Sequence, residues 1–175
     1  ARQLSIIHAP LENKSGSNDR NLRILEAIPQ KNNSELFYYH MELLGAKRFT
    51  DAVEAGKTAL TQSTLTEENR YEILLNLASL ADRTTTREAL LLQALKLTPW
   101  RREALARLVS TAMDGESAPA ALAYARMMMA LPVPPDPLPW THRAVFYGWA
   151  GQMLYSEALR FSGRIREADV IERQY

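Results

Sequence analysis

Apolar residues recur at helical spacing through most of the chain. In the stretch that follows Ser34, for example, Leu36, Tyr39 and Leu43 fall three or four residues apart, so they lie on one face of a helix. A strand pattern occurs only at residues 4–7, where a short run of Leu, Ser and two Ile is rich in β-branched side chains. The pattern therefore predicts an all-α fold.

Capping residues mark the starts of several predicted helices. Thr66 precedes an apolar-periodic stretch and is expected to cap its first turn. Thr85 and Glu88 have the Thr-x-x-Glu spacing of a capping box, and Pro99 occupies the first position expected for the following helix. The predicted helices cover residues 22–28, 34–44, 51–60, 67–80, 89–97, 100–113, 120–130, 141–162 (with a bend at Gly148 or Gly151) and 165–174.

A proline-rich stretch at residues 131–139 interrupts the helical pattern. Proline fixes φ and lacks an amide donor, so this stretch is predicted to be an extended loop. Pro132 and Pro135 have the Pro-x-x-Pro spacing that proline-binding modules recognise. A rigid spacer between helix pairs is the competing interpretation.

The predicted helices form pairs, and the pairs recur. Similar endings of the second helix fall at Leu60, Leu95 and Met128, which are 35 and 33 residues apart. The tetratricopeptide repeat, a pair of antiparallel helices, has a period of about 34 residues. The sequence therefore predicts tetratricopeptide-like antiparallel helix pairs that form a short right-handed solenoid over residues 34–175, with the proline-rich insertion at 131–139. A generic helical bundle is the alternative.

Four positions depart from the usual pattern of this repeat, and one of them is Gly56, which stands where an aromatic residue is usual. His40 stands where the repeat has a small residue, and Lys47 stands in the inter-helix turn where glycine is usual. In the second pair Ala89 falls two residues out of register, so we expect an altered turn between its two helices. Small residues inside the two helices, as at the position of His40, normally let the paired helices approach closely.

The N-terminal residues resemble a known family. Residues 4–8 (Leu-Ser-Ile-Ile-His), a polar loop and residues 19–26 (Asp-Arg-Asn-Leu-Arg-Ile-Leu-Glu) are similar to a segment of bacterial family 2 glycosyltransferases, whose catalytic domain is followed by tetratricopeptide repeats. The resemblance implies that residues 1–33 are the remnant of a catalytic-domain C-terminus plus a linker helix. It also implies a parent enzyme that uses a nucleotide sugar with a divalent metal. In that parent His8 is a candidate metal residue, and a polar loop residue is the competing interpretation.

Composition and motifs exclude several kinds of chemistry. The 175 residues contain no Cys, which excludes disulfides, Cys-ligated zinc and thiol nucleophiles. The chain also lacks Asp-x-Asp, His-Glu-x-x-His and glycine-rich phosphate-loop motifs. We therefore predict no catalytic, cofactor-binding or metal residue and no cofactor in this chain.

Charge and hydropathy limit the classes of partner. The formal net charge of +1 gives no global attraction to nucleic acid, and nucleic acid is not an expected partner. One local basic and aromatic cluster, at Trp100, Arg101, Arg102 and Arg107, is the only feature that favours it. No apolar run approaches the roughly 20 residues of a membrane span, so we expect none, and we expect a cytoplasmic location.

A concave groove is the expected binding surface, because repeats of this kind bind partners along the face lined by the first helix of each pair. The register places Ser34, Phe37, Met41 and Leu44 there in the first pair, Asn69, Glu72, Asn76 and Ser79 in the second, and Glu103, Ala106, Ser110 and Met113 in the third. Partner contacts are expected at Phe37, Met41, Leu44, Asn69, Glu72, Asn76 and Ser110. The expected ligand is a protein or peptide, or a second copy of the chain.

These observations predict a protein-interaction or scaffold module. Through the resemblance, it is the non-catalytic C-terminal part of a nucleotide-sugar-dependent glycosyltransferase. The alternative is a free-standing tetratricopeptide adaptor with no enzymatic parent.

Overall fold

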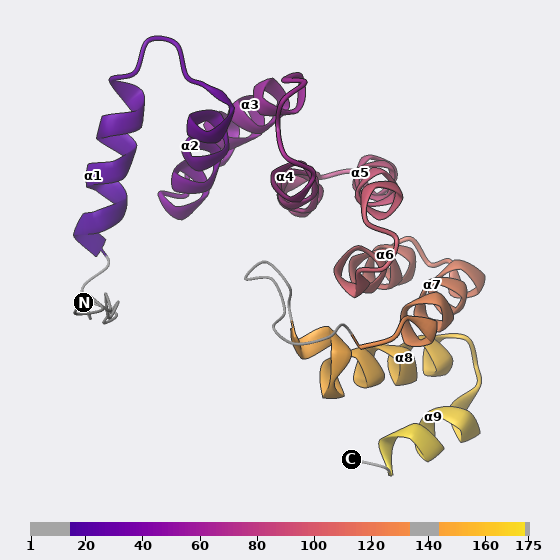
Figure 1. The fold of residues 1–175 in the computed structure, drawn as a ribbon. Coiled ribbons are helices and arrows are strands. Elements are labelled where there is room, and N and C mark those ends of the chain that lie inside the picture. Colours follow the sequence, from indigo (N-terminus) through magenta and orange to yellow (C-terminus); the bar gives the residue numbers. More distant parts are fainter. Residues whose placement is uncertain (1–14, 134–143, 174–175) are drawn as a thin grey trace, which may run out of the picture. The chain divides into compact units, whose positions relative to one another are not determined.

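A computed structural model describes residues 15–133 and 144–173 of the chain (Figure 1). The chain divides into two compact units, one up to Gln62 and one from Ser63 onward. The first unit contains α1 (Ser15–Glu26), α2 (Asn33–Gly45) and α3 (Phe49–Leu60). The second contains α4 (Glu67–Leu80), α5 (Thr84–Leu97), α6 (Arg102–Asp114), α7 (Ala118–Ala130), the 3₁₀ helix η1 (Ala144–Tyr147), α8 (Trp149–Phe161) and α9 (Ile165–Glu172).

Every regular element of the described residues is helical, and the prediction of an all-α fold is confirmed. The predicted strand at residues 4–7 lies outside the described residues, as do His8 and residues 134–139 of the proline-rich stretch. The boundary predicted at residues 33 and 34 stays a prediction.

In the first unit, α2 and α3 form an antiparallel pair and α1 packs on α2. Leu22 of α1 lies in one buried cluster with Leu43 of α2 and with Ala52 and Ala55 of α3. His40, the unusual large residue of this pair, is also buried, and its Nδ1 lies 2.8 Å from the carbonyl oxygen of Ala52. The small side chain of Ala52 leaves room for the imidazole, and the hydrogen bond satisfies one of its nitrogens.

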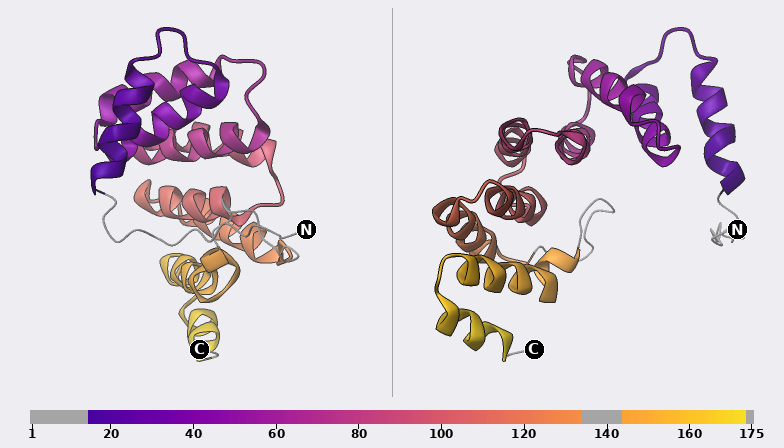
Figure 2. Two further views of the ribbon diagram at one scale, coloured as in Figure 1. Left: turned by 60° about the vertical axis from the view of Figure 1, so that its left-hand side comes forward. Right: turned by 180° about the vertical axis from the view of Figure 1, so that it is seen from behind.

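In the second unit, α4 and α5, α6 and α7, and α8 and α9 form three helix pairs that stack in chain order, as Figure 2 shows. The helix α6 packs against α5 and α8, and α7 packs against α8. Val109, Ala125 and Ala158 form a buried cluster where the second and third of these pairs meet. The predicted tetratricopeptide-like pairing is therefore confirmed.

The turn inside a pair repeats in detail. Lys47, Glu116 and Gly163 have φ of 59°, 55° and 74°, the left-handed conformation that favours glycine. In each turn the amide of this residue donates to the carbonyl three residues earlier, and the next amide donates to the carbonyl five residues earlier, at 2.8–3.0 Å. This bond pair is the Schellman motif, which satisfies the carbonyls at the end of the first helix.

The turn between α4 and α5 is different, as predicted from the register of Ala89. Ala81 ends α4 in an extended conformation, with φ −77° and ψ 124°, and no residue of this turn has positive φ. The chain therefore leaves α4 without the left-handed step of the other three turns.

The helix starts follow the sequence only in part. Thr66 caps α4 by accepting from the amide of Asn69 at 3.2 Å, as predicted. The predicted capping box at Thr85 is wrong, because α5 already begins at Thr84 and the carboxylate of Glu88 accepts instead from the hydroxyl of Tyr124 at 3.0 Å. The Glu88 carboxylate thus bonds to Tyr124 of α7 and does not cap the start of α5.

The starts of α6 and α8 were also predicted from the sequence, one wrongly and one correctly. The prediction that Pro99 is the first helical residue is wrong, since α6 begins only at Arg102 after a turn. The bend predicted at Gly148 or Gly151 is confirmed at Gly148, where η1 ends and α8 begins.

The last helix pair carries a partly exposed ion-pair cluster that joins α8 to α9. Arg160 of α8 binds Asp169 at 2.6 Å and Glu172 at 2.7 Å, and the Ser156 hydroxyl donates to Glu172 at 2.6 Å. These bonds hold the pKa of Glu172 at about 2. When the turns at Glu116 and Gly163 are aligned, the equivalent positions in the preceding pair are Val109, Met113 and Ala125, which are apolar and pack against α8.

Candidate functional site

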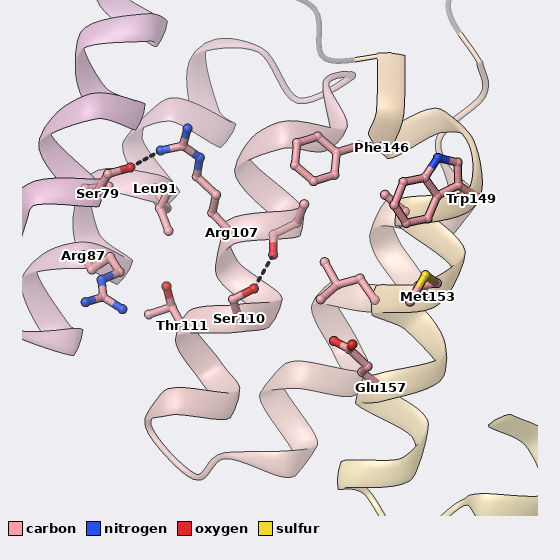
Figure 3. Close-up of a pocket in the computed structure, with 14 residues that line it drawn as sticks. Ser79, Arg87, Leu91, Arg107, Ser110, Thr111, Phe146, Trp149, Met153 and Glu157 are labelled. Atoms are coloured by element: carbon pink, nitrogen blue, oxygen red, sulfur yellow. Dashed lines mark hydrogen bonds between the residues drawn. The ribbon is translucent and has the colours of Figure 1, made fainter. Parts of the chain in front are cut away.

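The candidate site is a groove of about 590 Å³ in the second unit (Figure 3). It is lined by the first helices of the three pairs, α4, α6 and α8, together with η1 and two residues of α5. Two unlike walls face each other across it. We call the side formed by α4, α5 and α6 the polar wall, and the side formed by η1 and α8 the apolar wall.

The polar wall is built around Arg107 of α6. One nitrogen of its guanidinium donates to the carbonyl oxygen of Leu75 at 2.5 Å and to the hydroxyl of Ser79, so the side chain is held against α4. Arg87 of α5 is held by Asp114, at 2.7 Å. The hydroxyl groups of Ser110 and Thr111 complete this wall.

The apolar wall is a stripe along α8. Trp149 and Met153 are 60% and 50% exposed although both are large and apolar. Glu157 follows them, and because the three residues are spaced by four they share one face of the helix. Phe146 of η1 extends the wall beyond Trp149 (Figure 3). Exposed apolar side chains gathered in a groove are typical of binding sites.

Arg102 positions the apolar wall. Its buried guanidinium donates to the carbonyl oxygens of Leu131 and Phe146, the latter at 3.3 Å, and lies 4.9 Å from the ring centre of Tyr147. Its backbone amide donates to the Tyr147 hydroxyl at 3.1 Å. Arg102 therefore fastens the chain on both sides of the proline-rich insertion to the start of α6. Burial lowers the pKa of this guanidinium, which nonetheless stays charged at neutral pH.

A second buried arginine joins α4 to α6. Arg101 binds Glu68 at 2.8 Å and the fully buried Glu103 at 3.1 Å, and its guanidinium lies 4.1 Å from the ring centre of Tyr71. Burial raises the pKa of Tyr71, so the phenol stays neutral and its oxygen accepts from the amide of Ala104 at 3.2 Å. This cluster holds the two helices that carry the polar wall.

The arginines of the basic cluster predicted from the sequence thus have different environments in the structure. Arg101 and Arg102 are 0% and 5% exposed and bind groups inside the second unit. Of the three arginines only Arg107 lines the groove.

The residues predicted for the groove are distributed over both units. Ser110 lines the groove and is exposed, and Ser79 and Ala106 line it as well. Phe37, Glu72 and Glu103 lie in the interior, with exposures of 2%, 6% and 0%. Five of the other predicted residues are half-buried: Met41 and Leu44 in the first unit, and Asn69, Asn76 and Met113 in the second. Ser34 is exposed.

Sequence reasoning missed Arg107 as a groove residue, and it missed the whole apolar wall. The expected groove was placed on the first three pairs and was not extended to the last one. Aligning Gly163 with Glu116 would have placed Glu157 at the position of Ser110 and Met153 at the position of Ala106.

Within the described ranges, no three His, Cys, Asp or Glu side chains gather as a metal site would require. None of the described helices combines the length and apolar character needed to cross a bilayer.

Comparison with known proteins places the fold. No family model matches the chain, and no curated protein does. A crystal structure of the MamA protein is similar, with a TM-score of 0.67 and 17% identity over 91% of this chain and 81% of that one. MamA from MSR-1 has a TM-score of 0.66 at 10% identity and covers 92% and 90%.

At these identities the likeness concerns the fold alone, and it supports a tetratricopeptide-type fold. The family and curated-protein comparisons lend no support to the resemblance to glycosyltransferases.

Proposed function

We propose that this chain is a protein-interaction module that binds a peptide segment of its partner in the groove of the second unit. One observation carries the proposal, namely the stripe of Trp149 and Met153 that stands exposed opposite the polar wall. A groove of this composition combines apolar anchors with a few directional polar groups, as peptide sites do.

Trp149 and Met153 can contribute a substantial part of the free energy of binding a peptide. Full burial of a large apolar side chain contributes about 1.5–3 kcal/mol. Trp149 and Met153 are half-exposed or more, so covering both supplies roughly 2–3 kcal/mol before the polar contacts are added. Trp is also the residue type most enriched among interface hot spots.

An unbiased peptide-display selection against the full chain tests this proposal. Ser110 is exposed and lines the groove, so Ser110→Trp should fill the groove and abolish binding of the selected peptides without unfolding the protein. Ala123→Trp, on an exposed position of α7 outside the groove, is the matched control and should bind as the parent does. Equal binding by both variants, or the absence of any selected peptide, would refute the proposal.

The wider role has two versions. The resemblance of residues 19–26 favours a module attached to a glycosyltransferase, whereas a free-standing adaptor accounts equally well for the fold. Coding sequence upstream of Ala1 decides between them, because only the first version requires an adjoining domain with an Asp-x-Asp motif. The cytoplasmic location belongs to the same proposal and is tested by cell fractionation.

Self-association is a separate outcome. In sedimentation velocity, the peptide-binding proposal predicts that Ser110→Trp leaves the oligomeric state unchanged. A change of state with this variant would show that the groove holds a second copy of the chain.

A further inference from the structure

We infer that the groove binds its partner as an amphipathic α-helix, which packs an apolar stripe on α8 and places a Lys or Arg beside Glu157. The inference rests on the proposed function and specifies the conformation and charge of the peptide. Its basis is the hydrogen bonding of the polar wall and the spacing of the exposed side chains on α8.

The polar groups of the polar wall are largely engaged within the protein. The hydroxyls of Ser79 and Ser110 donate to backbone carbonyls four residues earlier in their own helices, at 3.1 and 3.4 Å. Arg87 binds the carboxylate of Asp114 at 2.7 Å, and Arg107 is bonded to α4. These side chains therefore shape the wall more than they offer hydrogen bonds to a ligand.

The apolar wall offers still less to a peptide backbone. Phe146, Ala150, Met153 and Leu154 have no polar hydrogen to donate, and the indole of Trp149 has one. An extended peptide laid along this wall would lose water from amide and carbonyl groups that find no partner there, which is unfavourable. An α-helix bonds these groups internally and can pack on this wall without that loss.

The exposed side chains of α8 form a ridge that suits the packing of a second helix. Trp149, Met153 and Glu157 follow one another at intervals of four residues, all three are exposed, and they span about 12 Å along the helix axis (Figure 3). Side chains at this interval form the ridges that fit between the side chains of a neighbouring helix. Apolar residues one turn apart on the ligand would therefore pack beside Trp149 and Met153.

Glu157 sets the charge that the ligand should carry. It is the one carboxylate among the residues that line the groove, and it has no ion pair or hydrogen bond within the part of the chain that the structure describes. Arg87, in contrast, is paired with Asp114. A Lys or Arg one turn beyond the apolar stripe of the ligand would lie beside Glu157, and an acidic residue there would be repelled.

Synthetic peptides of about 16 residues, long enough to form a helix, provide the probe. The first carries Leu and Phe along one helical face and a Lys one turn before and one turn after that stripe, so that either orientation brings a cation to Glu157. The second differs only by a Pro at a central position of the opposite face. The third has Glu in place of both Lys.

The second peptide tests the conformation of the ligand. Proline in the middle of a helix costs about 3 kcal/mol, more than a factor of one hundred in the helical population, and it leaves the apolar and charged side chains in place. Fluorescence anisotropy with the full chain should show at least tenfold weaker binding of the Pro peptide. An extended ligand would not lose affinity in this way.

The third peptide and one variant test the charge. At low salt the Lys peptide should bind several-fold more tightly than the Glu peptide, and the ratio should shrink as salt is raised, since exposed charges are screened. Glu157→Gln should reduce this ratio at least twofold. Glu67→Gln, on an exposed position of α4 outside the groove, changes the net charge equally and should leave the ratio unchanged.

The inference is overturned if none of the peptides binds, if the Pro peptide binds as well as its parent, or if the Glu peptide binds as well as the Lys peptide. It is also overturned if Glu157→Gln leaves the Lys to Glu ratio as it was. If display selects only peptides that cannot form a helix, and Ser110→Trp still excludes them, the proposed function stands and this inference alone fails.

Discussion

The repeated turn makes a quantitative prediction about stability. Glu116 and Gly163 occupy equivalent left-handed positions, with φ of 55° and 74°. We expect Glu116→Gly to stabilise the second unit and Gly163→Ala to destabilise it. Glycine is unfavourable inside a helix but favoured at a left-handed residue that follows one, so a stabilising glycine would be specific to this backbone conformation.

The magnitude follows from the backbone. A residue with a Cβ in the left-handed conformation costs about 1–2 kcal/mol. The greater freedom of glycine in the unfolded chain offsets roughly 0.5–1 kcal/mol of that gain. The net stabilisation by Glu116→Gly is therefore about 0.5–1 kcal/mol. A Cβ at Gly163 would meet no atom within 4 Å, so Gly163→Ala measures the backbone cost without a steric clash.

Tryptophan fluorescence during urea unfolding is the assay. All three tryptophans, Trp100, Trp140 and Trp149, follow Ser63, so the signal reports on the second unit. Glu116→Ala is the matched control, because it removes the same side chain but keeps a Cβ at positive φ. It should leave the unfolding midpoint close to that of the parent protein.

The reasoning would be refuted in either of two ways. Glu116→Gly could lower the midpoint as glycine does in a helix, or Gly163→Ala could leave it unchanged. Either result would mean that the left-handed turn is not what glycine relieves at these positions.

Three further predictions concern other parts of the molecule. Burial lowers the pKa of His40 below 6.5, so the first unit should lose stability as pH falls below 6.5, and hydrogen exchange in α2 should show this loss in the parent but not in His40→Gln. Arg102→Lys lacks the fork that binds two carbonyls, and exchange at η1 should rise at least tenfold. Ala59 is fully buried, so Ala59→Trp should destabilise the first unit by about 1–3 kcal/mol or more, measured by the same exchange, whereas Thr58→Trp on the exposed face should not.

Much of the fold could be predicted because its determinants are local. The spacing of Leu36, Tyr39 and Leu43 lies within one helix, and Thr66 acts on an amide three residues away. The period of the pairs likewise requires only the sequence. The altered second turn was visible as a shift in register at Ala89.

The parts that could not be predicted depend on distant residues. Glu88 fits a capping box in sequence, but Tyr124 lies 36 residues away and takes its carboxylate. Arg101 resembles a surface cation until Glu68, Glu103 and Tyr71 are brought around it by folding.

The predicted surface shares α4 and α6 with the groove of the second unit, but it also included α2 and left out η1 and α8. Its apolar wall belongs to the last pair, to which the predicted groove was not extended. The burial of Glu72 depends on packing that helical spacing alone does not reveal.

The ion-pair cluster of Ser156, Arg160 and Glu172 has a consequence for how the helix stack can be extended. Another pair stacked on α8 and α9 would have to strip water from Arg160, Asp169 and Glu172, and buried charges recover that desolvation only with well-placed partners. The apolar residues at the equivalent positions of the preceding pair pack against the next helix pair, whereas the charged residues here disfavour such packing. These ion pairs therefore disfavour the packing of an apolar helix face against this part of α8 and α9. An engineered helix pair designed to pack on this surface would first require these charges to be replaced.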